Sequence, residues 1–273
     1  TYDDLHDEQG NLIAASLVDA RRDLAELGAL EALTRQATPP IVAIRDGSLL
    51  WGHLEATPAA RRRQQENLDR FLTLLNQLRA HGATVAGYVD RTLRFDVSRM
   101  LSLSRLGAKQ LTRERLAPEA DPLRGLNDER IFSFLAPGQR SARFILQSHT
   151  NQTYAEYGHE RELEIWFFYL NVSLRPALPE VVRVEVPAWV ARDEVALNRI
   201  HAVLVQQSHI LEGAPYPYVL ARADELAVVG AEEKEHLEAL IMRELMQRDQ
   251  RVAPSRKARA KEHARGGRRR HQV

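Results

Sequence analysis

The chain has 273 residues, of which 44% are hydrophobic and 27% are charged. This size predicts one large domain, or one domain with appendages, around a hydrophobic core. The sequence has no uninterrupted apolar run of about 18 residues, which argues against a membrane-spanning helix. It also contains no cysteine, which excludes disulfides, thiolate zinc sites, iron–sulfur clusters and a cysteine nucleophile. The absence of cysteine fits a reducing compartment, and we expect the protein in the cytoplasm.

The formal net charge of +1 conceals an uneven distribution of charge along the chain. Residues 254–273 contain eight Lys or Arg and one Glu, whereas the other 253 residues contain 30 basic and 36 acidic side chains. A basic tail on an acidic body suits contact with a polyanion such as nucleic acid. The same composition also suits a disordered, solubilising terminus, and the tail alone leaves both interpretations open.

The first half of the chain alternates helices with short strands. Leucines at helical spacing predict helix over residues 12–36, in two pieces, ended by two prolines. The β-branched run 41–44 predicts a buried strand that stops at an Asp-Gly turn, with a return strand beginning at 48–51. A second amphipathic helix is expected over 58–80, and a strand that ends in an acid over 85–90.

The second half continues this alternation around residues 163–172, a nearly all-apolar run that predicts a central strand. Further strands are expected at 142–147 and 181–186. The remaining expectations are a proline-punctuated loop at 108–125 and helices at 96–106, 127–135, 193–211, 218–228 and 231–249. Together these elements predict an α/β protein with a mixed sheet, antiparallel hairpins among its strands, and helices packed on it.

Three aspartates lie at the ends of predicted elements. Asp46 follows a strand, Asp90 ends another, and Asp128 begins a helix. Strand-end carboxylates that meet at one edge of a sheet suit Mg²⁺ or Mn²⁺, which prefer carboxylate oxygen and retain water ligands. Two such ions can activate a water and stabilise the leaving oxygen in phosphodiester hydrolysis. Position alone leaves simpler roles open. Asp46 also suits a turn, Asp90 a surface pair with Arg91, and Asp128 a helix cap.

Six segments of the sequence carry a family resemblance. They are IVAIRDGSLL (41–50), VAGYVDR (85–91), GLNDERIFSFLAPGQRSARF (125–144), IWFFYLNV (165–172), VVRVEVPAWVA (181–191) and YPYVLARADELAVV (216–229). Taken together and in this order, they resemble the blocks of the NurA nuclease family. The resemblance covers most of the chain, from the strand that runs into Asp-Gly-Ser to the last predicted helices.

The resemblance implies a fold, an activity and partners. The expected fold is a ribonuclease-H-like mixed sheet flanked by helices, with additional N-terminal and C-terminal helices. The expected activity is a Mn²⁺-dependent DNA nuclease, with Mg²⁺ as a possible substitute, that acts as a 5′–3′ exonuclease and a single-strand endonuclease. The implied partners are DNA ends, a second copy of the chain and the hexameric HerA translocase in end resection at double-strand breaks. Because no Walker motif is present in the sequence, a partner would have to hydrolyse ATP.

The resemblance also divides the chain into three parts. Residues 1–37 form an N-terminal helical segment that we expect in dimer or partner contact. Residues 38–250 form the nuclease domain, and residues 251–273 form a basic, disordered tail.

The same resemblance assigns roles to individual residues. Asp46, Asp90 and Asp128 match the family's acidic metal ligands, and Tyr216 matches a tyrosine near the active site. The sequence departs from the family at Asp224, which stands where the family carries a histidine. Asp224 is able to bind a hard cation, but it cannot act as an imidazole.

This departure keeps a second function open, in which the chain is a catalytically impaired subunit that binds DNA ends or serves as an adaptor. A third hypothesis is an enzyme of the same fold that acts on RNA or hybrids, because the sequence does not show how a 2′-hydroxyl would be sensed.

Two arginines are candidates for contact with DNA. Arg140, in Gly-Gln-Arg-Ser, suits bidentate binding of a backbone phosphate, or it is a surface loop residue. Arg183 and Glu185 alternate with valines and therefore share one face of a strand. Either Arg183 contacts a phosphate with Glu185 as its orienting partner, or the two form a polar pair on an exposed face of the sheet.

Overall fold

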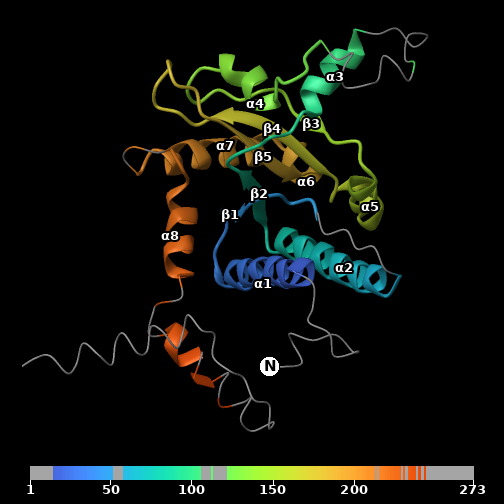
Figure 1. Ribbon diagram of the computed structural model, residues 1–273, viewed down its shortest axis with the longest axis vertical. Helices are drawn as coiled ribbons and strands as arrows, with labels where there is room; N and C mark the ends of the chain where they lie inside the picture. The colour runs from blue at the N-terminus through green and yellow to red at the C-terminus, as the bar shows by residue number, and fades with distance from the viewer. Residues whose placement is uncertain are drawn as a thin grey trace, which may run out of the picture. The chain divides into compact units, whose positions relative to one another are not determined.

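A computed structural model gives the structure of the chain (Figure 1). It describes residues 15–51, 58–105, 112, 122–211, 213, 215–228, 230, 233–237, 239, 240 and 243. The chain divides into two compact units, Thr1–Arg222 and Ala223–Val273. Among the described residues, all five strands lie in the first unit.

The elements follow one another in the order expected of an α/β protein. They are α1 (Ala15–Gln36), β1 (Ile41–Asp46), α2 (Pro58–Ala80), β2 (Ala83–Val89), α3 (Asp96–Ser104), α4 (Asp128–Ile131), the 3₁₀ turn η4 (Phe132–Phe134), β3 (Phe144–Ile145), α5 (His149–Tyr157), the 3₁₀ turn η5 (His159–Arg161), β4 (Ile165–Asn171), β5 (Val181–Pro187), α6 (Ala188–Ala191), α7 (Glu194–Ser208) and α8 (Tyr218–Leu226).

The five strands form one mixed sheet in the order β1-β2-β5-β4-β3. β1 and β2 are parallel, and the other three pairings are antiparallel. The middle strand, β5, is buried along its whole length, because helices cover both faces of the sheet. This mixed sheet flanked by helices confirms the predicted fold class and is consistent with a ribonuclease-H-like fold.

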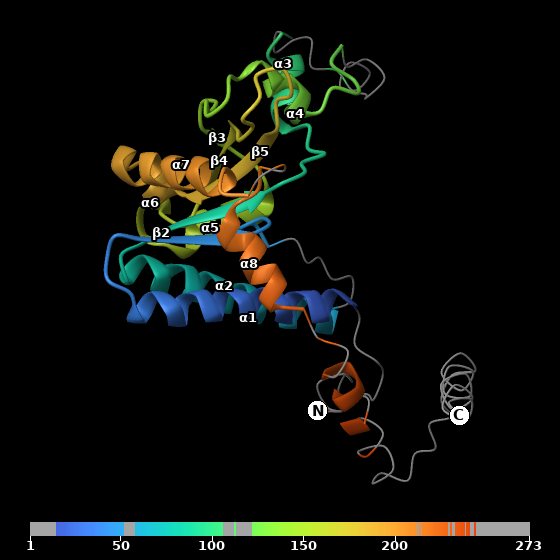
Figure 2. The ribbon, with the colours of Figure 1, turned by 90° about the vertical axis from the view of Figure 1, so that its left-hand side faces the viewer.

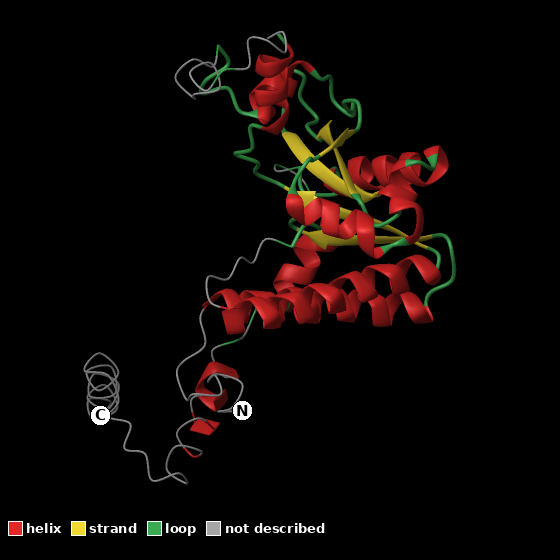
Figure 3. Ribbon diagram, turned by 90° about the vertical axis from the view of Figure 1, so that its right-hand side faces the viewer, coloured by secondary structure: helices red, strands yellow, loops and turns green. Residues whose placement is uncertain are grey.

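Helices cover the two faces of the sheet separately (Figures 2 and 3). α1 and α2 lie side by side on one face, where the apolar stripe of α2 packs against β1 and β2. On the same face, at the far ends of β4 and β5, α3 and η4 pack against Phe167 and Tyr169. α6 and α7 cover the other face, and Leu197 and Ile200 of α7 meet the valines of β5 there. We call these the α1–α3 face and the α7 face.

Several predicted elements differ from those observed. The helix predicted in two pieces over 12–36 is one continuous helix from Ala15. Residues 48–51 are not a return strand but an irregular segment with bends at Leu49 and Leu50, because side chains of other elements bind their backbone. The strand at 142–147 is reduced to two residues at the sheet edge. Residues 163–172 contain an interior strand, but β5 is the middle one.

Some expectations concern residues outside the described part of the chain. These are most of the loop at 108–125, parts of the helix at 231–249, and the basic tail. Helix α5 was not predicted, although Ser148 caps its start by accepting a hydrogen bond from the amide of Asn151. Among the described residues, no helix has both the length and the apolar character that a membrane crossing would require.

Candidate active site at the ends of strands β1 and β2

The segment that follows β1, residues 46–51, is the best-defined feature of the site, and we call it the Asp46 turn. β1 ends at Asp46, whose side chain is exposed. Gly47 then adopts a left-handed backbone conformation with φ of 89°, which glycine adopts without the steric cost of a Cβ atom. The Gly47 amide donates a hydrogen bond of 2.7 Å to the carbonyl of Tyr88 in β2. The turn therefore begins as a direct continuation of the β1–β2 pairing.

Glu185 of β5 binds the Asp46 turn from the α1–α3 face. Its Oε2 accepts hydrogen bonds from the Ser48 hydroxyl at 2.7 Å and from the Leu49 amide at 2.9 Å. The guanidinium of Arg45 donates to the Ser48 carbonyl. Glu185 is 2% exposed, so these bonds form away from water, where an unpaired donor is costly.

Tyr154 of α5 holds the far end of the turn. Its hydroxyl accepts a hydrogen bond from the Trp51 amide and donates one to the Leu49 carbonyl, both at 2.9 Å. The ring is fully buried, and burial raises the pKa of Tyr154. The phenol is therefore protonated and able to donate at neutral pH.

Gly87 of β2 gives the Asp46 turn the space that it occupies. A Cβ atom at this position would lie 2.7 Å from the Gly47 carbonyl oxygen and 2.9 Å from Cγ of Leu49. Both distances are too short for real carbon contacts. The turn thus packs directly on the backbone of β2, and a side chain at residue 87 would displace it.

A buried ion-pair chain runs from the Asp46 turn to α3. Arg183 is 1% exposed, and its Nε donates to Oε1 of Glu185 at 2.8 Å. Its Nη1 donates to Oδ2 of Asp96, the first residue of α3, at 2.9 Å. The guanidinium carbon lies 3.6 Å from the centroid of the Phe167 ring, which suits a cation–π contact. Glu185 and Arg183 therefore connect the turn to the helix that follows β2.

On the α7 face of the sheet, two further predicted residues, Asp90 and Tyr216, lie near Asp46. Tyr88 pairs with Asp46 in the β1–β2 register, and its ring meets that of Tyr216 edge to face at 5.6 Å. Burial raises the pKa of Tyr88, and the negative charge of Asp90 raises it further. The side chain of Asp90, just beyond β2, is 50% exposed and lies 3.9 Å from Arg91. The structure thus brings Asp46, Asp90 and Tyr216 to the same end of the β1–β2 pair.

Asp128 lies on the α1–α3 face and has no exposed surface. Its carboxylate accepts hydrogen bonds from the amides of Val97 and Ser98, at 3.1 and 2.8 Å, and from the Tyr169 hydroxyl at 2.6 Å. Burial raises the pKa of Tyr169, and the hydrogen bond to Asp128 raises it further. Asp128 therefore caps the N-terminus of α3, where a negative charge is favourable.

The helix-cap alternative for Asp128 thus describes this structure, although on another helix than expected. The cap of its own helix, α4, is Asn127, whose side chain accepts from the Arg130 amide. Strand alternation places Asp46 on the α7 face, together with Tyr88 and Val184, and Arg183 and Tyr169 on the other. The structure does not gather Asp128 with Asp46 and Asp90.

The two arginines expected to bind DNA have protein partners. Arg140 donates to Asn198 Oδ1 at 2.8 Å, shares a hydrogen bond of 3.1 Å with His201, and is partly buried against α7. Burial lowers the pKa of Arg140. Arg183 is completely covered, so the exposed-face alternative for Arg183 and Glu185 is wrong. A phosphate contact by Arg183 would require this cover to open.

Asp224 is exposed on α8, beyond the point at which the second unit begins. Its backbone carbonyl accepts a hydrogen bond of 3.2 Å from the amide of Ala227, as in the last turn of a helix.

The surroundings of Asp46 decide whether protein side chains alone are able to hold a metal ion there. Within the described part of the chain, no group of three or more His, Cys, Asp or Glu side chains is arranged to hold a metal ion. Burial raises the pKa of Glu26 on α1; the charges of Arg45 and Arg22 oppose this rise, and the carboxylates of Asp23 and Asp46 add to it. Asp46 thus lies near both acidic and basic side chains, since Arg45 forms an ion pair of 2.7 Å with Asp23.

Sequence reasoning missed four residues that shape the site: Gly87, Asp96, Tyr154 and Tyr169. Asp96 at the start of a predicted helix was the only one with a local signal, as acids favour helix N-termini. The other three are defined by contacts between segments far apart in the chain.

Comparison with known proteins places this geometry in context. The family model described as the NurA domain matches residues 6–229, which is most of the chain. No curated protein matches the chain, and no solved structure does.

Proposed function

The chain belongs to the NurA family of nucleases, and from this premise we propose that it hydrolyses DNA phosphodiester bonds at the Asp46 turn with the help of a divalent cation. The observation that carries the proposal is the turn itself. An exposed carboxylate stands at the end of β1, on a backbone fixed by Tyr88, Glu185 and Tyr154. A metal ligand benefits from such support, because residues that do not bind the metal themselves hold the ligand in its orientation.

The residues near the turn fit a hard cation. Mg²⁺ and Mn²⁺ are commonly held by one or two carboxylates, with waters and substrate phosphates completing the coordination. Asp46 and Asp90 would supply those carboxylates, and a group of three protein ligands is not required. Of the two ions we propose Mn²⁺, with Mg²⁺ as a substitute. When bound, such a cation lowers the pKa of a coordinated water and neutralises charge on the phosphate.

The chain's own residues have distinct tasks in this proposal. Asp46 and Asp90 would bind and orient the cation on the α7 face of the sheet. Glu185 keeps the backbone of the Asp46 turn in place from the α1–α3 face. Tyr216, held edge to face by Tyr88, would contact the substrate or an attacking water. Asp128 supports the site indirectly, because it fixes the start of α3. We include Asp224 as a further carboxylate at the position of the family histidine.

The finer activity follows the family. We propose 5′–3′ exonuclease and single-strand endonuclease activity on DNA, performed by a homodimer in the cytoplasm together with a HerA-type hexameric ATPase in end resection at double-strand breaks. The helical segment before residue 38 would serve dimer or partner contact. Part of its apolar stripe is already used, since Leu24 and Leu27 are buried in the core.

A degradation assay tests the proposal. End-labelled single- and double-stranded DNA is incubated with the purified chain in Mn²⁺, Mg²⁺ or EDTA, and in parallel with the Asp46→Asn variant. We expect cleavage with Mn²⁺ that is lost in EDTA and in the variant. RNA and hybrid substrates of the same sequence test the alternative of an enzyme that acts on RNA. If the wild type is inert both alone and with a HerA-type partner, the proposal is wrong.

The departure at Asp224 supports a second candidate, an impaired subunit that binds DNA ends without cutting them. A carboxylate cannot supply the cation or the neutral donor that an imidazole supplies at a leaving group. The Asp224→His variant separates the two candidates. An inert wild type together with a variant that cleaves would favour the impaired subunit, whereas a wild type that cleaves would exclude it.

A further inference from the structure

A third exposed acid, Glu180, lies at the same edge of the sheet as Asp46 and Asp90. It directly precedes β5. Because β2 and β5 are antiparallel, the start of β5 meets the end of β2, where Asp90 lies. Continued by one residue, the β2–β5 register places Asp90 beside Val182, and Glu180 is two residues before Val182 in the chain. Such diagonal neighbours lie about 7–8 Å apart, within reach of long side chains.

The side chain of Glu180 belongs to the α7 face of the sheet. Val181 packs in the core of the α1–α3 face and Val182 in the core of the α7 face, so alternation along the strand places Glu180 with Val182. An electrostatic effect on Tyr88, which is also on the α7 face, agrees with this placement. Burial raises the pKa of Tyr88, and the charge of Glu180 is among the causes that add to the rise.

A buried side chain fixes the backbone of Glu180. Asn171 has no exposed surface, and its Oδ1 accepts hydrogen bonds from the amide of Glu180 at 3.2 Å and from the amide of Ser173 at 3.0 Å. The carbonyl of Glu180 accepts a further hydrogen bond of 2.9 Å from the amide of Val172. The Asp46 turn has the same construction, in which an exposed carboxylate stands on a backbone bound by buried polar side chains. Such support suits a metal ligand, which must keep one orientation.

Two buried hydroxyls lie next to these acids. Tyr88 and Ser208 have no exposed surface, and neither hydroxyl has a hydrogen-bond partner within the described part of the chain. Ser208, at the end of α7, is close enough to oppose the rise that burial and Asp90 cause in the pKa of Tyr88. Buried polar groups without a partner are rare, so this pair indicates acceptors that arrive with a ligand. Carboxylate oxygens of Asp90 and Glu180, turned toward a shared cation, would be such acceptors.

We propose that Glu180 is a ligand of a divalent cation that it shares with Asp90. The inference rests on the proposed function and deepens it, because it adds a protein ligand to the nuclease site. Two strand spacings of about 4.8 Å and four residues of about 3.3 Å separate Glu180 from Asp46, so these two acids do not hold one ion directly. Asp90 lies between them and is able to contribute to both positions.

Binding would require rotation of exposed side chains rather than movement of the backbone. No three acidic or histidine side chains among the described residues already converge on one point. Glu180 and Asp90 are both exposed, so their side chains are free to turn toward an ion, while Asn171 holds the backbone of Glu180 in place.

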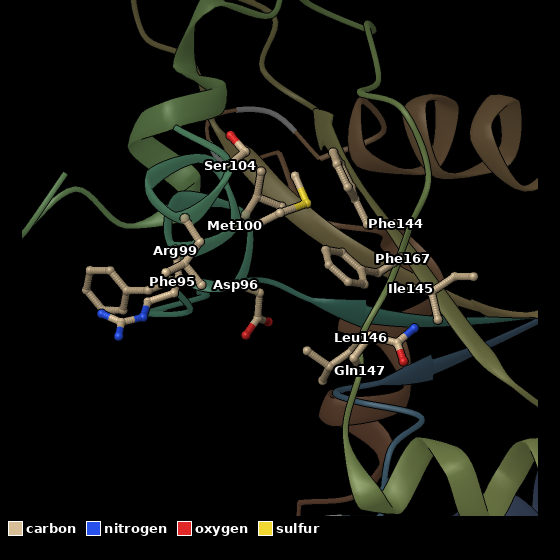
Figure 4. A pocket seen from close by; sticks show the side chains of 12 residues that line it. Phe95, Asp96, Arg99, Met100, Ser104, Phe144, Ile145, Leu146, Gln147 and Phe167 are labelled. Carbon is tan, nitrogen blue, oxygen red and sulfur yellow. The ribbon is translucent and has the colours of Figure 1, made fainter. Parts of the chain in front are cut away.

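A competing place for a cation is the hollow between α3 and β3, on the α1–α3 face (Figure 4). Asp96 is the one acid among the described residues that line it, and it already forms ion pairs with Arg183 and Arg94, at 2.9 and 3.1 Å. Arg99 lines the same hollow, and Figure 4 shows it on α3 together with Asp96. The hollow therefore offers a cation a compensated carboxylate beside basic groups, whereas the strand edge offers exposed carboxylates.

Mn²⁺ binding tests the proposal without cleavage. The electron paramagnetic resonance signal of free Mn²⁺ is titrated with the wild type, with Glu180→Gln and with the control Glu156→Gln, which changes an exposed acid on α5. Each titration is repeated with a phosphorothioate oligonucleotide that resists cleavage, because substrate phosphates complete the coordination of such ions.

We expect Glu180→Gln to weaken Mn²⁺ binding at least about tenfold, since even residues that only support a ligand are worth roughly 10–100-fold in metal affinity. The control should bind as the wild type does. Cleavage by Glu180→Gln should need correspondingly more Mn²⁺ to reach half of its maximal rate. Because Glu180 is exposed, the variant should keep the free energy of unfolding of the wild type.

Tyr88→Phe tests the buried hydroxyl. The substitution keeps the ring and removes a polar group that lacks a partner, so the free energy of unfolding in EDTA should be unchanged or higher. The affinity for Mn²⁺ should nevertheless fall, because Asp90 and Glu180 lose a donor that orients them. A variant that loses stability and keeps its affinity for Mn²⁺ would refute the part assigned to this hydroxyl.

The outcomes separate this inference from the proposed function. Mn²⁺ binding by Glu180→Gln equal to that of the wild type would overturn the inference, and so would a wild type that binds no Mn²⁺. If Asp46→Asn loses Mn²⁺ and cleavage but Glu180→Gln loses neither, the proposed function stands and the inference is wrong. If Glu180→Gln loses Mn²⁺ while the wild type fails to cleave DNA, the proposed function is wrong and the inference stands.

Discussion

Replacing Glu185 by alanine should be the most damaging single change among the residues that support the site. The substitution removes the acceptor of the Ser48 hydroxyl, the Leu49 amide and Nε of Arg183. A buried donor left unpaired costs about 1–3 kcal/mol, and breaking a buried ion pair costs about 3–5 kcal/mol. Asp96 still contacts Arg183, so we expect a loss of about 3–5 kcal/mol rather than the sum. That is a large fraction of the roughly 5–15 kcal/mol by which domains are stable.

Urea unfolding of three variants measures this loss and its origin. Glu185→Gln keeps an oxygen for Ser48 and Leu49, and we expect it to lie between the wild type and Glu185→Ala. The double variant Arg183→Met with Glu185→Leu removes both charges and should recover most of the stability, because apolar replacements of buried pairs are often neutral. It should not recover cleavage, since the Asp46 turn still lacks its acceptor. A loss below about 1 kcal/mol in Glu185→Ala, or a double variant no more stable than the single one, would refute this reasoning.

Three further predictions follow from the geometry. Asp46→Asn should reduce cleavage at least about 100-fold, more than the roughly 10–100-fold typical of changes to residues that only support a metal ligand. The same variant should shift the free energy of unfolding by less than about 0.5 kcal/mol, because the side chain is exposed. A large shift in the free energy of unfolding would contradict this. Gly87→Ala should cost about 1–3 kcal/mol by overpacking and slow cleavage, whereas the control Gly28→Ala, with open space around it, should be neutral or stabilising in urea unfolding. Stability should fall above about pH 10, where unfolded tyrosines ionise. A buried tyrosine with a raised pKa in the folded state contributes stability that is fully present below that pH. This contribution is lost as the pH rises, by about 1.4 kcal/mol per pH unit for each group. The three groups concerned are Tyr88, Tyr154 and Tyr169. A free energy of unfolding that stays constant up to about pH 11 would count against their burial. So would an ultraviolet titration in which all seven tyrosines of the folded chain ionise by that pH.

The fold was predictable where a local pattern decides the structure. The apolar stripe of α2 and the buried runs of β4 and β5 are written in consecutive residues, and these elements appear close to their expected bounds. Residues 48–51 were misjudged because their β-like composition is overridden by Glu185 and Tyr154, which lie more than 100 residues away. Strand order was also not predictable, because β5 enters between β2 and β4 through pairings that no local signal specifies.

The candidate site was predictable in part for the same reason. Asp46 and Asp90 follow adjacent parallel strands, and parallel strands bring their carboxyl ends to one edge without further information. The position of Asp128 depends on the packing of α3 against β4, through Tyr169. Sequence alone could name that residue as a cap but not the helix that it would cap.

The buried pair of Arg183 and Glu185 shows why exposure was the wrong assumption for charges on a strand. Alternation correctly places the two on one face, and charged residues are seldom fully buried unless they are paired. Here each charge has a specific partner outside the pair, since Glu185 binds the Asp46 turn and Arg183 binds Asp96. A buried ion pair is weak support for stability by itself, because desolvation offsets the attraction. Its geometric consequence is firmer. Any displacement of the turn leaves a buried carboxylate without its donors, so the pair restricts the Asp46 turn to one position. A nuclease site requires such a restriction, because small displacements of a catalytic group reduce the rate by large factors.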